Sequence, residues 1–202
     1  MRRHALSLVL AMATMAGPLA ILAFPGDASA SVSVAVTWEG LLHESAAAAV
    51  ATPIESRAAW ENGRIYTYTH VRVDRVVAGE VPVGTDVWVR TMGGVVGKIG
   101  QIVEGEAVFA DGLQSLLFLR SGPAGSFEVT ARAQGQFPVV AATPSAPARV
   151  IRNRAAGAVF SPPPAIVPSK ATRLAADVLH GRSVDDAASE VVADWTHLHA
   201  RP

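Results

Sequence analysis

Several short patterns in this chain contain residue types that can bind metals. His43-Glu44 begins like the zinc-binding HExxH helix, but Ala47 stands where the second histidine is needed. His197 and His199 lie two residues apart, and that spacing does not place two side chains on one helix face. We therefore expect no metal site, no zinc protease and no other cofactor.

A glycine-rich stretch at 93–100 matches two nucleotide-binding motifs only in part. It contains Gly97-Lys98, but Met92 occupies the first glycine position of a P-loop and Ile99 its hydroxyl position. The glycine spacing also differs from the Rossmann fingerprint, and no helix signal follows it. No Gly-x-Ser-x-Gly pattern occurs anywhere in the sequence. The sequence therefore predicts a flexible hairpin at 93–100 and contains no complete catalytic motif.

The remaining residues with binding chemistry alternate along two expected strands. Aromatic rings stack on ligands, and arginines hydrogen-bond to them. If the strands at 65–77 and 86–92 pair, they place six such side chains on one sheet face: Tyr66, Tyr68, His70, Arg72, Trp88 and Arg90. OB-like barrels use this kind of face to bind extended oligomers. The sequence thus predicts a ligand-binding site on this aromatic–arginine face, although such residues are also common on exposed strands.

The elements that must position this face are mostly strands. Asn62-Gly63 is typical of a type I′ turn and predicts a hairpin between 46–59 and 65–77, with Pro53 marking an edge strand or a break. Residues 116–119 are apolar on both faces, which is typical of a core strand. Further strands are expected at 31–37, 86–92, 102–109 and 127–132. Strand–turn–strand order favours a mainly β protein with a small antiparallel OB-like barrel, and a β-sandwich is the alternative.

A family resemblance rests on short segments that occur in a fixed order. They are Gly63-Arg64-Ile65-Tyr66-Thr67, Val71-x-Val73 leading into Val77-Ala78-Gly79, Gly93-Gly94-x-x-Gly97, Leu116 to Leu119, and Gly135-Gln136-Phe137. Over roughly residues 40–140 the chain resembles an uncharacterised family of secreted bacterial β-barrel proteins. More distantly, it resembles the netrin and metalloproteinase-inhibitor class of OB-like modules. That class is usually tethered by disulfides, whereas this chain has no cysteine. The resemblance implies a barrel and assigns no catalytic residue.

The two ends of the chain differ from its middle. Arg2 and Arg3 precede an apolar run, and Ala28-Ser29-Ala30 is a small-x-small cleavage site, so residues 1–30 read as a secretory signal peptide. We expect a β-barrel domain at 31–141, a Pro-rich linker at 142–168 and a helical tail at 169–202. Helix caps are expected at two serines, and an apolar stripe is expected on the second helix. These residues are Ser169, Ser183 and the stripe Val184, Ala188, Val191, Trp195 and Leu198.

Composition narrows the functional classes. Lys and Arg number 17, as do Asp and Glu, and this balance disfavours a nucleic-acid partner. The absence of cysteine excludes disulfides and thiol catalysis. Abundant Ala, Gly and Val, with Arg preferred over Lys, suggest a GC-rich bacterial genome, and we expect no membrane span after signal cleavage. The sequence favours an exported protein, periplasmic or extracellular, that acts as a non-catalytic binding module for a protein, peptide or glycan. The alternatives are a structural or assembly protein of the cell envelope and a hydrolase with a dispersed site.

Overall fold

The computed structural model describes residues 33–81, 86–160 and 172–199. The expected signal peptide and the expected cap at Ser169 lie outside these residues. No helix in the described part of the chain is long and apolar enough to cross a membrane.

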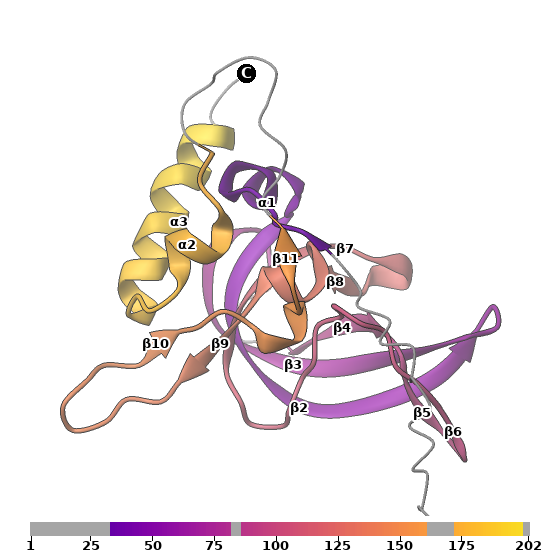
Figure 1. Cartoon of the computed structure of the whole chain (residues 1–202). Coiled ribbons are helices and arrows are strands. Elements are labelled where there is room, and N and C mark those ends of the chain that lie inside the picture. The colour runs from indigo at the N-terminus through magenta and orange to yellow at the C-terminus, as the bar shows by residue number, and fades with distance from the viewer. Residues whose placement is uncertain (1–32, 82–85, 161–171, 200–202) are drawn as a thin grey trace, which may run out of the picture.

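Five strands close into a barrel. β2 (Ala47–Glu61) pairs antiparallel with both β3 (Arg64–Gly79) and β7 (Ser115–Ser121). β3 pairs with β4 (Asp86–Met92), and β8 (Phe127–Val129) closes the ring by pairing parallel with β4 and antiparallel with β7. The result is the small closed barrel of Figure 1, which is consistent with an OB-like fold. The prediction of a mainly β barrel with C-terminal helices is confirmed.

Shorter strands surround this ring. β9 and β10 extend the sheet beyond β7, β5 and β6 form a separate hairpin, and β1 pairs parallel with β11. Their bounds are β1 Ser33–Val34, β5 Gly94–Val96, β6 Ile99–Gln101, β9 Gln136–Val140, β10 Arg149–Val150 and β11 Val159–Phe160. Three 3₁₀ turns lie at η1 Pro123–Gly125, η2 Arg132–Gly135 and η3 Arg154–Ala156. β10 and β11 fall within the described part of the expected Pro-rich linker, so this part contributes strands to the fold.

The β2–β3 hairpin follows from its turn residues. Asn62 and Gly63 both have positive φ, as a type I′ turn requires, and they fix the pairing of Glu61 with Arg64. Pro53 lies where the register of β2 shifts and where its second partner ends, because β7 pairs only with the segment from Ala47 to Ala51. β2 is therefore a central strand before Pro53 and an edge strand after it.

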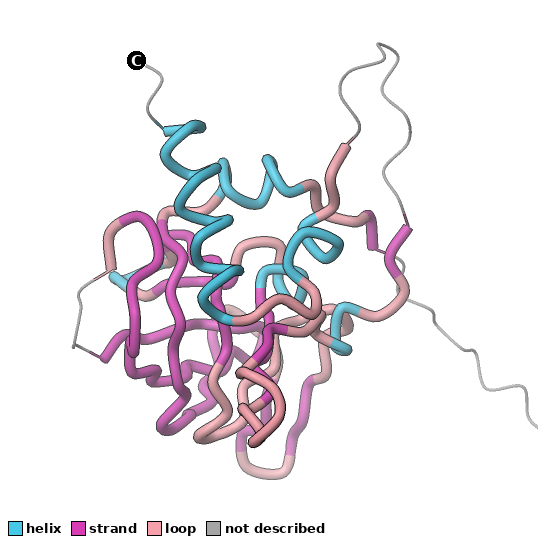
Figure 2. Tube along the Cα trace, turned by 90° about the vertical axis from the view of Figure 1, so that its left-hand side faces the viewer, coloured by secondary structure: helices cyan, strands magenta, loops and turns pink. Residues whose placement is uncertain are grey.

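The core has two layers separated by β2 and β7. Leu117 and Leu119 face the barrel interior, whereas Leu116 and Phe118 face the helices, as the doubly apolar pattern predicted. The helices are α1 (Trp38–Glu44), α2 (Ala175–Leu179) and α3 (Val184–His199), and they gather on one side of the strands (Figure 2). Val191 of the predicted stripe is fully buried there, and Ser183 caps α3 through the N–H of Asp186.

Two expected strands, at 102–109 and 127–132, differ from the structure. Residues 102–109 form no strand, because their backbone groups bond within the loop and to a side chain instead of to a neighbouring strand. The Glu106 N–H donates to the Val103 carbonyl, and the Val108 N–H and C=O both bond the side-chain amide of Gln136. The expected long strand at 127–132 ends at Val129, because Ala131 and Arg132 take positive φ and turn the chain into η2.

Candidate functional site

The structure brings five of the six residues of the aromatic–arginine face into one cluster. β3 and β4 pair with Tyr68 opposite Arg90 and His70 opposite Trp88. The His70 and Trp88 rings stack with centroids 4.6 Å apart, and the Arg90 guanidinium lies 3.4 Å from the centroid of Tyr66. The sixth residue, Arg72, is exposed.

Carboxylates that the sequence analysis did not single out neutralise this face. Arg90 forms ion pairs with Glu61 at 2.9 Å and with Glu128 at 2.8 Å, and Arg72 pairs with Asp74 at 2.9 Å. The Tyr68 hydroxyl also donates to Glu61. The face therefore satisfies much of its own hydrogen-bonding capacity, which leaves less of it for a ligand.

The pKa values follow these contacts. Hydrogen bonds from Tyr68 and Arg90 lower the pKa of Glu61. Burial, and then the hydrogen bond to Glu61, raises the pKa of the Tyr68 phenol. Burial lowers the pKa of Arg90, but hydrogen bonds to Glu61 and Glu128 outweigh it, so the pKa lies above its ordinary value. The Glu61 carboxylate and the Arg90 guanidinium therefore stay charged near neutral pH, and the Tyr68 phenol stays neutral.

A second site lies on the inner side of the same strands, where the barrel opens beneath the β5–β6 hairpin. It is a groove of about 1050 Å³, including the solvent at its opening, and we call it the barrel-mouth groove. Its lining residues are Ser56, Thr67, Thr69, Thr91, Met92, Gly93, Gly94, Val95, Gly100, Gln101, Ile102, Val103, Glu106, Ala107, Val108 and Phe109. The sequence analysis assigned none of them to a site.

The floor of the barrel-mouth groove presents hydroxyls that are already bonded. Ser56 and Thr69 bond each other at 3.1 Å, Thr67 donates to the Gly93 carbonyl at 2.7 Å, and Thr91 donates to the Thr67 carbonyl. These bonds take up much of the hydrogen-bonding capacity of the floor, and the surface that lines the groove is mostly apolar. The groove is therefore suited to apolar groups more than to a polar ligand.

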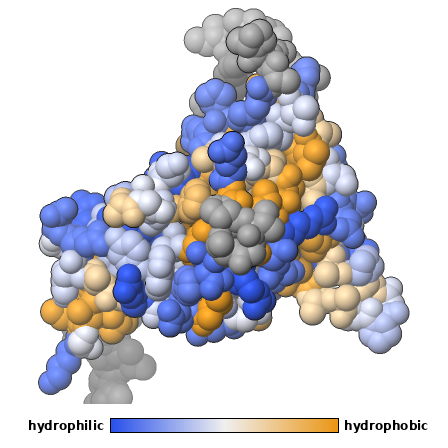
Figure 3. All heavy atoms as spheres, turned by 180° about the vertical axis from the view of Figure 1, so that it is seen from behind, coloured by the Kyte–Doolittle hydropathy of each residue, from blue (hydrophilic) through white to orange (hydrophobic). Residues whose placement is uncertain are grey.

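The walls of this groove carry exposed apolar side chains. Ile102 is 90% exposed, Val95 68% and Val108 65%. Viewed from behind, Figure 3 shows apolar surface at the side of the molecule where the β5–β6 hairpin lies. Apolar side chains that gather in this way around a cavity are typical of an interaction site.

Gly94 allows the β5–β6 hairpin, which forms one wall of the groove, to pack closely against β3. Gly94 has φ +132°, and a Cβ at this position would lie 2.3 Å from Thr67 Oγ1. A larger residue cannot let the hairpin approach β3 so closely. The glycine-rich stretch at 93–100 is therefore a hairpin, as predicted, and it is packed against the barrel.

One carboxyl lines the groove. Glu106 is buried, accepts a hydrogen bond from the Ala107 N–H at 3.1 Å and lies 3.9 Å from Arg132. Burial raises the pKa of this carboxyl. Among the described residues, no group of three or more His, Asp or Glu side chains is arranged to hold a metal ion.

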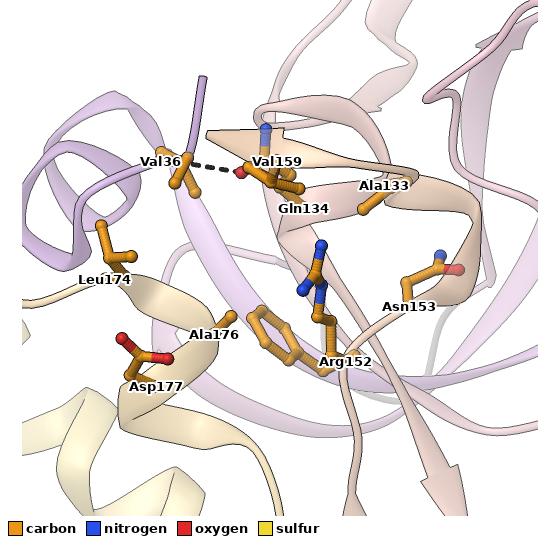
Figure 4. Close-up of a pocket in the computed structure, with 12 residues that line it drawn as sticks. Val36, Ala133, Gln134, Arg152, Asn153, Val159, Leu174, Ala176 and Asp177 are labelled. Atoms are coloured by element: carbon orange, nitrogen blue, oxygen red, sulfur yellow. Dashed lines mark hydrogen bonds between the residues drawn. The ribbon is translucent and has the colours of Figure 1, made fainter. Parts of the chain in front are cut away.

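A third cavity, of about 530 Å³, lies between the N-terminal segment and α2 (Figure 4). Two of its polar side chains form hydrogen bonds with the backbone around it. Gln134 accepts from Val36 N–H at 2.8 Å and donates to Val34 C=O, and Arg152 donates to Gly157 C=O. These contacts attach the first strand to the barrel, so we interpret this cavity as structural.

In comparisons with known proteins, the chain matches no family model, no curated protein and no solved structure. The class of this protein is therefore described from its own fold and sites. It is a small closed β-barrel of OB-like form, with helices packed against one side and an apolar groove at its mouth.

Proposed function

We propose that this protein is an exported, non-catalytic binding module that takes an apolar segment of a protein or peptide partner in the barrel-mouth groove. The observation that carries the proposal is the groove itself, with its bonded hydroxyl floor and its exposed Val95, Ile102 and Val108. The secretory pattern of residues 1–30 supports export, to the periplasm or the medium.

The test is titration with a neutral apolar dye, N-phenyl-1-naphthylamine, on protein purified from the exported fraction. We expect saturable dye fluorescence that the double variant Ile102→Asp plus Val108→Asp weakens about tenfold or more. Both side chains are exposed, so these substitutions leave the core intact.

Val140→Asp is the matched control, because Val140 is an exposed valine on β9 that does not line the groove. Dye binding should survive this change. If the wild-type protein binds no dye, or if Val140→Asp lowers binding as much as the groove variant, the groove is not the site.

The aromatic–arginine face is the second candidate. A polar hollow of about 520 Å³ lies beside Tyr66 and Arg90 and is also lined by Arg120 and Arg132. This hollow favours a polar ligand such as a glycan, which OB-like barrels bind on the corresponding face. Screening on glycan arrays tests this candidate. Binding that is lost on Tyr66→Ala, which changes a residue of the hollow, would support this candidate, and binding that persists in this variant would exclude it.

A further inference from the structure

The outer half of β2 is a sheet edge. From Glu55 to Glu61, β2 pairs with β3 alone among the described residues, because its pairing with β7 ends at Ala51; Ile54 lies at a register shift and has no partner on β3. Figure 1 shows the β2–β3 ribbon extending to one side of the barrel, with the β5–β6 hairpin beside it. We call the segment Ile54–Glu61 the β2 edge.

Such an edge has a specific binding chemistry. Along a strand with one neighbour, alternate residues point their backbone N–H and C=O groups away from the sheet. The Pro53 carbonyl, just before the β2 edge, already accepts from Gly112 N–H at 2.9 Å. The eight residues that follow span about 25 Å and form a template for another extended chain.

The β2 edge adjoins the barrel-mouth groove. Ser56 pairs with Thr69 and Ala58 with Thr67, so both face the inner side of the sheet, and Ser56 lines the groove. Ala58 lies under the β5–β6 hairpin, close to Gly94. Ser56 is small and lines the groove, so it leaves room on this side for the side chains of an added strand, whereas the inner side of Ala58 is covered by the hairpin.

The opposite side of the β2 edge is charged. Glu55 and Arg57 are exposed and lie opposite His70 and Tyr68 on β3, on the outer face of the sheet. Charges of both signs disfavour pairing of this edge with an apolar strand of another copy. They fit a ligand whose outward side chains are polar.

We infer that the ligand is an extended polypeptide that adds to the β2 edge as a strand, with apolar side chains at alternate positions entering the barrel-mouth groove. This inference rests on the proposed function and deepens it. Only a polypeptide supplies N–H and C=O groups at strand spacing, whereas a lipid chain would fill the groove without using the edge. The expected ligand is a segment of about six to eight residues with alternating apolar and polar side chains.

The experiment selects short random peptides on the exported protein and studies the tightest one as a synthetic peptide. Each backbone N–H of that peptide is replaced in turn by N-methyl, which removes one donor and leaves the side chain in place. We expect affinity to fall about tenfold or more at every second position in the bound segment, where N–H groups face the β2 edge. Hydrogen exchange of the protein should slow within residues 54–61 when the peptide binds.

The outcomes separate the two proposals. Alternating losses together with slowed exchange at 54–61 support strand addition. Peptide binding without alternation and without slowed exchange overturns it, as does failure to select any peptide while dye binding is intact; the groove would then still bind apolar molecules. If neither dye nor peptide binds, the proposed function itself fails.

Discussion

Glu106 is a single side chain that makes the stability of the fold depend on pH. Burial raises its pKa above the ordinary value of 4.5, so the folded protein binds this proton more tightly than the unfolded chain does. The contribution of Glu106 to stability is therefore full at low pH and is lost as the pH rises from 4.5 through the raised value.

We predict that Glu106→Gln increases the free energy of unfolding near neutral pH, because the neutral amide avoids the burial of a charge. The gain should shrink toward zero below pH 4.5, where the carboxyl is protonated in both states. Urea denaturation of both proteins across this range measures the difference. A gain that does not change with pH would mean that the carboxyl does not titrate as proposed.

Gly94 makes a second residue-scale prediction. Gly94→Ala should destabilise the fold by about 2 kcal/mol or more and weaken dye binding, because the new methyl group pushes the β5–β6 hairpin away from Thr67. Gly97→Ala, in the same hairpin but with open space around it, should cost only about 1 kcal/mol. Thermal unfolding and dye titration measure both effects. Equal effects of the two variants would contradict this role of Gly94.

At the scale of elements, α3 is part of the core. Its buried face packs on α1 and the outer side of the barrel, and Asp194 accepts from the Trp38 indole at 2.6 Å and from Arg173 at 2.5 Å. Burial raises the pKa of Asp194, but these two hydrogen bonds outweigh it and hold the pKa below its ordinary value.

Two adjacent valines on α3 test this packing. Val191 is fully buried, so Val191→Asp should lower the free energy of unfolding by roughly 3 kcal/mol or more. Val192 is 45% exposed, so Val192→Asp should change it by no more than about 0.5 kcal/mol. Chemical denaturation compares the two variants. If Val191→Asp lowered the free energy of unfolding as little as Val192→Asp does, α3 would not be packed into the core.

At the scale of the whole molecule, the prediction concerns export and cleavage of the signal peptide. We predict that an expressing bacterium cleaves the chain after Ala30, because Ala28-Ser29-Ala30 follows an apolar run with a basic start. Intact-mass measurement of the exported protein should then give a chain that begins at Ser31. An exported protein that retains Met1 to Ala30 would contradict cleavage.

The register of the β2–β3 hairpin can be predicted from the sequence. A two-residue turn at Asn62-Gly63 pairs Glu61 with Arg64, and counting outward places Arg57 opposite Tyr68 and Glu55 opposite His70. This count could have identified Arg57, which lies 4.5 Å from the Trp88 ring. Glu128 could not be found in this way, because it reaches Arg90 only through barrel closure.

The sequence by itself determined the strand alternation, the hairpin turn and the doubly buried strand at 116–119, because side-chain period and turn conformation are local properties. Only the tertiary structure decided how β8 closes the ring, where β2 becomes an edge and how residues 102–109 border a groove. Each of these depends on contacts between distant segments: β4 with β8, Gly112 with Pro53, and Val108 with Gln136. Local patterning determines which face of a strand is apolar, whereas the partner of that face is determined by closure of the whole chain.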